Sequence, residues 1–168
     1  RKSSKFINYR NNKIKHQSNY VHKFGDNVSP GYVDRICNSK CNGKKNRILF
    51  ISSTGKRKYQ DIIGTIVDKK VLNVKEKTRY VIFMFGILPD LRNKGYGRSS
   101  LMLYHNFVAS KKKRTEIVLH SLKSSFGFYK KIGYLEIEVN HFLLNFEGYN
   151  IENKDDMILL KIIIPKIR

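Results

Sequence analysis

Apolar residues gather in runs with the length of β-strands, and polar turns separate these runs. Residues 47–53, 62–72 and 78–88 are rich in Ile, Val, Leu and Phe, which predicts three strands. The third run is apolar on both faces, which is typical of a central strand. The other strands that this pattern predicts are 5–9, 116–122, 135–146 and 157–164.

Three segments place apolar residues at helical spacing. The first follows Pro30 and is expected to end at Gly43, and the second begins near Gly97. The third is short, with a cap at Ser124 and a stop at Gly133. With the strands, these helices predict an α/β (α+β) fold with a mixed sheet and helices on both faces.

The chain has 168 residues, of which 40% are hydrophobic, so we expect one domain over 1–168. Residues 1–23 are basic and weakly periodic, and we expect them to be less ordered. The chain has no apolar run long enough for a membrane span. A targeting segment removed before residue 1 would leave no trace in this sequence.

Two cysteines, Cys37 and Cys41, do not form a disulfide framework, so we expect reduced thiols in a cytoplasmic or nuclear protein. Together with His16 and His22 they are candidate ligands of a metal site with two histidines and two cysteines. Their order and spacing match no zinc motif, so we expect no metal.

The net charge is +21, from 34 Lys and Arg against 13 Asp and Glu. Such a field attracts phosphates, nucleotides and nucleic acid, so weak binding of polyanions is one interpretation. The other is compositional bias, because Lys, Asn, Ile and Tyr are abundant together, as in AT-rich coding sequences. We expect no membrane association and either a monomer or a homodimer.

The stretch 85–98 predicts a strand, a glycine loop and a helix, in that order. Unpaired backbone N–H groups and the dipole at a helix start favour an anion, and this loop is rich in Arg and Lys. A dinucleotide fingerprint would need glycine at Ser100, and Gly55-Lys56-Arg57 does not fit a P-loop. We therefore interpret the stretch as a pyrophosphate site of another kind.

Two motifs carry a family resemblance. Arg92-Asn93-Lys94-Gly95-Tyr96-Gly97 resembles the Arg/Gln-x-x-Gly-x-Gly/Ala signature of the GNAT superfamily of acyl-CoA N-acyltransferases. Downstream, Phe128-Tyr129-Lys130-Lys131-Ile132-Gly133-Tyr134 is similar to the second motif of this family, Phe-Tyr-x-x-x-Gly-Phe. The resemblance implies a largely antiparallel sheet of six to seven strands that is splayed at its middle. It also implies transfer of an acetyl group from acetyl-CoA directly to a primary amine.

The resemblance assigns cofactor contacts. The backbone of Phe85 and Ile87 would pair with the pantetheine arm, and Gly86 would form a bulge that splays the strand. The loop that would hold the pyrophosphate consists of Arg92, Asn93, Lys94, Gly95, Tyr96, Gly97 and Arg98.

The resemblance also assigns catalytic roles. Tyr129 matches the position whose phenol protonates the departing thiolate, and His120 is a candidate base. Two positions depart from the family pattern: Leu122 replaces an Asn, and Val81 replaces the Glu base of histone-type members. Glu76 and Tyr80 are further candidates for the base.

The acceptor amine stays open between a protein amine, a small amine and an amino-sugar phosphate. Acidic residues concentrate near the last strands, which border the acceptor side in this family, whereas the overall charge favours an anionic acceptor. Six of the 13 acids lie there, namely Glu136, Glu138, Glu147, Glu152, Asp155 and Asp156. The alternative is a GNAT-fold protein that binds CoA or nucleic acid without catalysis.

Overall fold

The computed structural model describes residues 5–8, 21–24, 29–38, 40–41, 44–54, 59–110, 112–138 and 157–166. The chain forms two compact units. Unit 1 comprises Arg1–Asp68 and Met84–Phe107, and unit 2 comprises Lys69–Phe83 and Val108–Arg168. Strands β5 (Ile62–Asn73) and β6 (Lys77–Ile87) contribute residues to both units.

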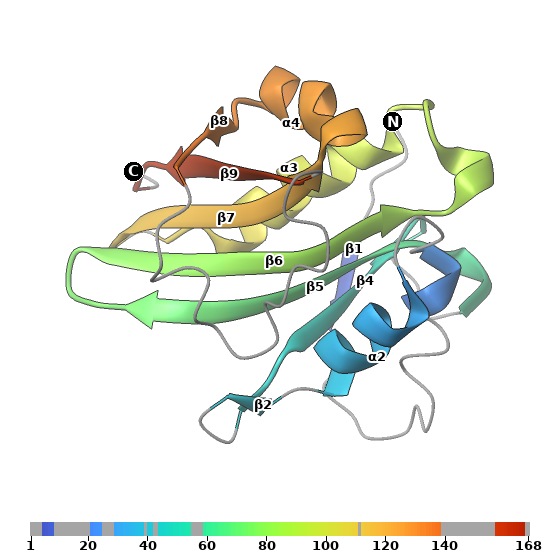
Figure 1. Cartoon of the computed structure of the whole chain (residues 1–168), viewed down its shortest axis with the longest axis horizontal. Coiled ribbons are helices and arrows are strands. Elements are labelled where there is room, and N and C mark those ends of the chain that lie inside the picture. The colour runs from blue at the N-terminus through green and yellow to red at the C-terminus, as the bar shows by residue number, and fades with distance from the viewer. Residues whose placement is uncertain are drawn as a thin grey trace. The chain divides into compact units, whose positions relative to one another are not determined.

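Seven strands form a sheet in the order β1-β4-β5-β6-β7-β9-β8. The pairing of β6 with β7 is parallel and the other pairings are antiparallel, which confirms the mixed, largely antiparallel sheet (Figure 1). The remaining strands of this sheet are β1 (Lys5–Asn8), β4 (Arg47–Ser52), β7 (Arg114–Leu122), β8 (Leu135–Glu136) and β9 (Met157–Ile164).

In unit 1, β4 pairs with β1 on one side and with β5 on the other. Five consecutive residues of β4 are buried, so both faces of this strand are covered. Helix α2 (Pro30–Asn38) lies in front of β4 in Figure 1 and buries Val33, Ile36 and Cys37. Helix α3 (Tyr96–Val108) buries Leu101 and Tyr104 completely.

In unit 2, the parallel register of β6 and β7 runs from Lys77↔Arg114 to Ile82↔Leu119. The pairing of β6 with β7 ends at Ile82, although β6 continues to Ile87. The end of this pairing lies in the middle of the sheet, where we expected the splay. On its other side β7 pairs with β9 from Thr115↔Ile164 to Leu122↔Met157. Helix α4 (Phe126–Ile132) follows β7 after a single 3-10 turn, η4 (Lys123–Ser125).

The end of α4 confirms the predicted stop. Gly133 has φ 108°, a left-handed conformation that glycine adopts without strain. Its N–H donates to Lys130 O at 3.0 Å, and the Tyr134 N–H donates to Tyr129 O at 3.1 Å. These two bonds form a Schellman motif, which satisfies carbonyls at the helix end.

Two helix boundaries were predicted wrongly. The first helix ends at Asn38, not at Gly43, because Asn46 Nδ2 donates to the Ile36 carbonyl at 2.7 Å and satisfies one of its last acceptors. Residues of the expected last turn instead form a short hairpin, β2 (Lys40–Cys41) with β3 (Lys44–Lys45). Ser124 lies within the turn η4, and α4 begins without a side-chain cap.

The described part of the sheet does not include the whole of the expected strand 135–146. The first residues of the expected strand form β8, and the Ile137 N–H donates to Leu159 O at 3.0 Å. Residues 139–156 lie outside the described residues. No helix among the described residues is long and apolar enough to cross a membrane.

Candidate functional site

The loop after β6 is positioned by a chain of backbone hydrogen bonds in unit 1. The Leu88 N–H donates to Ile63 O of β5 at 2.9 Å, and Pro89 then starts the 3-10 turn η3 (Pro89–Leu91). The Leu91 N–H donates to Leu88 O at 2.9 Å, and the Arg92 N–H donates to Pro89 O at 3.1 Å. This closed turn sets the direction in which the loop leaves the strand.

Two residues of the loop have a positive φ. Asn93 has φ 59° and Gly95 has φ 82°, and both precede the first residue of α3. A Cβ on Gly95 would meet no atom within 4 Å, so the backbone conformation and not crowding favours glycine there. Left-handed residues alternating with right-handed ones aim successive N–H groups at one point, a geometry that binds anions.

Several backbone amides of this loop lie before the first hydrogen bond of α3. The first helical hydrogen bond is from the Ser99 N–H to Gly95 O at 3.1 Å. Among the described residues, no well-aligned acceptor is found for the six N–H groups before it, those of Asn93, Lys94, Gly95, Tyr96, Gly97 and Arg98. Lys94 and Arg98 are exposed and add positive charge at the helix start.

Arg92 has a structural role that the sequence did not indicate. Its Nε donates to the Ile87 carbonyl at 3.0 Å, and the residue is half-buried. The guanidinium therefore ties the loop to the last residue of β6. Substitution of Arg92 would change both the charge and the position of the loop.

The backbone of β6 places Phe85 and Ile87 on one edge of the strand. Because N–H and C=O groups of alternate residues face opposite edges, and Leu88 bonds to β5, these two residues face away from β5. The contact between Arg92 and Ile87 O agrees with this orientation. It is the edge along which an extended pantetheine arm was predicted to pair.

Gly86 is required by a close contact within unit 1. A Cβ on Gly86 would lie 2.1 Å from the Phe24 carbonyl oxygen, a distance that no side chain can occupy. A Cβ on Gly64 would in turn lie 2.8 Å from Gly86 O. The bulge at Gly86 stays a prediction, and the sequence held no signal of the contact with Phe24.

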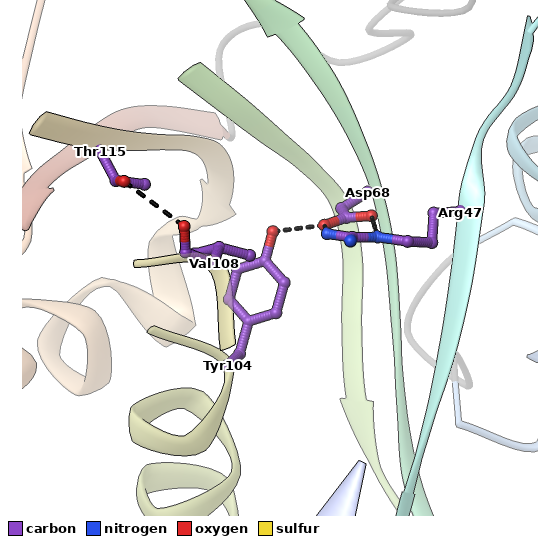
Figure 2. Close-up of polar contacts among 5 residues, drawn as sticks. All are labelled: Arg47, Asp68, Tyr104, Val108 and Thr115. Atoms are coloured by element: carbon purple, nitrogen blue, oxygen red, sulfur yellow. Dashed lines mark hydrogen bonds and ion pairs between the residues drawn. The ribbon is translucent and has the colours of Figure 1, made fainter. Parts of the chain in front are cut away.

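A buried polar network holds α3 against the sheet of unit 1. The Asp68 carboxylate on β5 is completely buried; it accepts a hydrogen bond from Arg47 Nε at 2.8 Å and another from Arg47 Nη2. Figure 2 shows that the Tyr104 hydroxyl, from α3, donates to the same carboxylate. One carboxylate thus joins β4, β5 and helix α3, which follows the loop described above.

Tyr129 lies in unit 2 on α4 and is 8% exposed. Its ring meets those of Phe128 and Tyr134 edge-on, at centroid distances of 5.0 and 5.5 Å. Among the described residues its hydroxyl has no hydrogen-bond partner. Burial raises the pKa of Tyr129, so the phenol stays protonated at neutral pH and its O–H can donate a hydrogen bond to a bound group.

His120 lies on β7, where it pairs with Leu159 of β9. Burial lowers the pKa of His120 to about 4, so the ring is neutral at pH 7 but is a weak proton acceptor. The other candidates have different surroundings: Glu76 is exposed, whereas Tyr80 is 8% exposed and has Lys70 Nζ 5.6 Å from its ring centre.

The four residues considered for a metal site are only partly described, and the described part of the chain contains no group of three or more metal-ligating side chains. His22 Nε2 lies 3.2 Å from Asp34 Oδ1. Burial, with a smaller effect of the Asp34 charge, raises the pKa of Cys37 to about 12, so it is a protonated thiol. His16 and the side chain of Cys41 lie outside the described residues.

The acids expected near the acceptor are only partly described. Glu136 and Glu138 are exposed in unit 2. The other four, Glu147, Glu152, Asp155 and Asp156, lie outside the described residues.

No protein-family model matches the chain, and no curated protein matches it. Several solved structures, in contrast, match the chain. Naa50 from Arabidopsis thaliana, in complex with the bisubstrate analogue CoA-Ac-MVNAL, is 17% identical with a TM-score of 0.61, over 95% of this chain and 98% of that one. An acetyltransferase from Thermus thermophilus is 10% identical with a TM-score of 0.62, over 96% of this chain and 97% of that one.

The ribosomal-protein-S18-alanine N-acetyltransferase from Escherichia coli is 13% identical with a TM-score of 0.56, over 96% of this chain and 94% of that one. At these identities the likeness concerns the fold. The chain therefore has the fold of the GNAT acetyltransferases, as the two sequence motifs implied.

Proposed function

We propose that this protein is an N-acetyltransferase that moves an acetyl group from acetyl-CoA directly to a primary amine. The observation that carries the proposal is the run of six backbone N–H groups without well-aligned acceptors at the start of α3, among the described residues. They follow the strand edge at Phe85 and Ile87, in a fold that acetyltransferases share. Phosphates of the cofactor would accept from these amides, and Lys94 and Arg98 would add charge.

The reaction forms a C–N bond between the acetyl carbon and the amine and breaks the C–S bond of the thioester. The amine nitrogen loses a proton to a base or to water, and the departing sulfur gains one. Tyr129 is the proposed donor to the sulfur, because its buried phenol is protonated and its hydroxyl has no partner among the described residues. A backbone N–H is the proposed donor to the thioester oxygen.

His120 is the proposed base, with ordered water as the alternative. The lowered pKa of His120 keeps the ring neutral at pH 7, which a base requires, but limits the driving force for proton abstraction. If His120 is the base, His120→Gln should lower kcat and change its pH dependence. If water carries the proton, His120→Gln should leave the pH profile unchanged.

For the acceptor we propose a protein or peptide amine as the first class to test, followed by small amines and amino-sugar phosphates. Support comes from neighbouring structures that were solved with peptide-like ligands: the NatC complex is bound to Gag peptide and CoA, and Naa50 to CoA-Ac-MVNAL. Thiol release from acetyl-CoA should be measured with each class in parallel.

Cofactor binding is tested by thermal shift. Saturating acetyl-CoA should raise the melting temperature of the wild type, because a ligand that binds only the folded state stabilises it. Gly95→Val should remove this shift, since valine at φ 82° forces the amides out of place. Gly31→Val is the matched control, because Gly31 lies on α2 with no atom within 4 Å of its added Cβ. An unchanged shift in Gly95→Val, or none in the wild type, would contradict cofactor binding at the loop.

A second candidate function is cofactor binding without acetyl transfer. It is favoured by the apolar Val81 and Leu122 at positions where family members have polar residues, and by the lowered pKa of His120. A clear thermal shift with acetyl-CoA, together with no thiol release for any acceptor class, would support this function over the enzyme.

A further inference from the structure

Several strand ends of unit 2 meet at one edge of the sheet, seen at the left of Figure 1. The Val74 N–H donates to Lys77 O at 3.0 Å and closes the turn between β5 and β6. The Arg114 N–H donates to Glu76 O at 3.1 Å, which brings the segment before β7 onto this turn. The pairing of Thr115 with Ile164 brings the end of β9 to the same place.

This edge is strongly basic. Cationic residues lie on the turn, on the first residues of β6, on the segment that enters β7 and directly after β9. We refer to them together as the basic edge: Lys75, Lys77, Arg79, Lys112, Lys113, Arg114 and Lys166. The acids among them in the described residues are Glu76 and Glu116. Seven positive charges against two negative ones leave a net charge of +5.

One buried carboxylate organises three of these cations. Glu116 accepts from Arg79 Nε at 2.9 Å, while Lys77 Nζ lies 3.4 Å and Arg114 Nη2 3.8 Å from its other oxygen. Burial raises the pKa of Glu116, but the Arg79 hydrogen bond and the neighbouring charges outweigh burial, and the pKa is lowered overall. Glu116 therefore stays ionised, yet it supplies one negative charge for three positive ones.

The other cations of the basic edge have no acid to neutralise them among the described residues. Lys113 Nζ contacts the neutral Asn73 Oδ1 at 2.8 Å. Lys75, Lys112 and Lys166 are exposed and form no ion pair with any described residue. Like charges held this close repel one another, and a bound polyanion would remove the repulsion.

We propose that the basic edge is a binding surface for the phosphate backbone of nucleic acid. A duplex carries one charge about every 1.7 Å along its axis, so one duplex can meet cations from the turn, the β7 segment and the end of β9 at once. No described residue of the edge is an exposed aromatic, so bases have no stacking platform, and we expect binding without sequence preference.

The test is binding of the full chain to a fluorescent 20-base-pair DNA duplex by anisotropy, with two unrelated sequences and a range of NaCl concentrations. The slope of log K against log salt is negative, and each lost phosphate contact makes it less steep by about 0.9. The double variant Lys75→Gln, Lys112→Gln should therefore reduce the steepness of the slope by about two. It should also weaken binding at least tenfold at 0.1 M salt.

The matched control is Lys130→Gln, Lys131→Gln, which removes the same charge from exposed residues of α4 in the same unit. It should leave the slope within about 0.5 of the wild type. Equal losses in both double variants would assign binding to the total charge and overturn the proposal, as would no binding at 50 mM NaCl. Tighter binding to vesicles of phosphatidylserine and phosphatidylcholine than to the duplex would overturn it in favour of a membrane surface.

The thermal shift with acetyl-CoA distinguishes a failure of the nucleic-acid proposal from a failure of the proposed acetyltransferase function. The basic-edge variant should retain the full shift, because none of its substituted residues belongs to the loop 92–98. Loss of the shift would mean that the substitutions disturb the fold, and the slope comparison would then be repeated with the single variant Lys166→Gln, whose expected change is about 0.9.

Discussion

Tyr104→Phe tests how firmly the buried network holds α3. The substitution keeps the ring and removes only the hydroxyl that donates to the fully buried Asp68. Asp68 keeps both hydrogen bonds from Arg47, so the charge remains paired. What is lost is one hydrogen bond to a charged acceptor, which contributes about 1.5–3 kcal/mol.

Such a loss is measurable by urea or thermal unfolding. For a domain of this size 1 kcal/mol corresponds to about 2–4 °C, so Tyr104→Phe should lower the melting temperature by about 3–12 °C. Thr115→Val is the control, because the Thr115 hydroxyl donates to the neutral Val108 carbonyl over 3.4 Å (Figure 2). The control should cost less than about 1 kcal/mol.

The same substitution should weaken acetyl-CoA binding, because α3 carries the amides of the loop at its first turn. We expect a higher KM for acetyl-CoA with kcat at saturation nearly unchanged, since Tyr104 lies within the core and touches no reacting group. A Tyr104→Phe protein as stable as the wild type within about 0.5 kcal/mol would refute the assignment of the network as the anchor of α3.

Three further predictions concern single residues. Tyr129→Phe should lower kcat at least tenfold while the acetyl-CoA thermal shift stays intact; equal turnover would remove Tyr129 from the mechanism. Gly86→Ala should destabilise the fold by more than about 2 kcal/mol in urea unfolding, because its Cβ would lie 2.1 Å from Phe24 O; unchanged stability would mean that this contact is not maintained. The pKa of Glu116 is lower in the folded state than in the unfolded state, so its carboxylate stabilises the fold fully above the unfolded-state pKa. This stabilisation is lost as the pH falls through the lower, folded-state pKa. Glu116→Gln should therefore flatten the loss of stability below about pH 4.5, and an unchanged pH profile would contradict the ion pairs.

The strands and the loop were predictable because their signals are local. Apolar runs mark strands wherever both faces are covered, and the glycine at position 95 marks a backbone conformation that other residues avoid. The stop at Gly133 was predicted for the same reason and is confirmed.

What could not be predicted depends on contacts between residues far apart in the chain. Asp68 lies inside an apolar run, and only the folded sheet brings Arg47 and Tyr104 to it. A charged residue within such a run is a signal that some partner exists, but not which one. The early end of α2 likewise depends on Asn46, which reaches back to Ile36 from beyond the short hairpin.

Burial of Cys37 has a practical consequence for enzymology. With a pKa of about 12, only about one Cys37 thiol in ten thousand is a thiolate at pH 8, so it reacts very slowly with disulfide reagents. Released CoA can therefore be followed continuously with such a reagent without a background from this residue. Alkylation of the native and the denatured protein would show the same protection directly, as a cysteine that is modified only after unfolding.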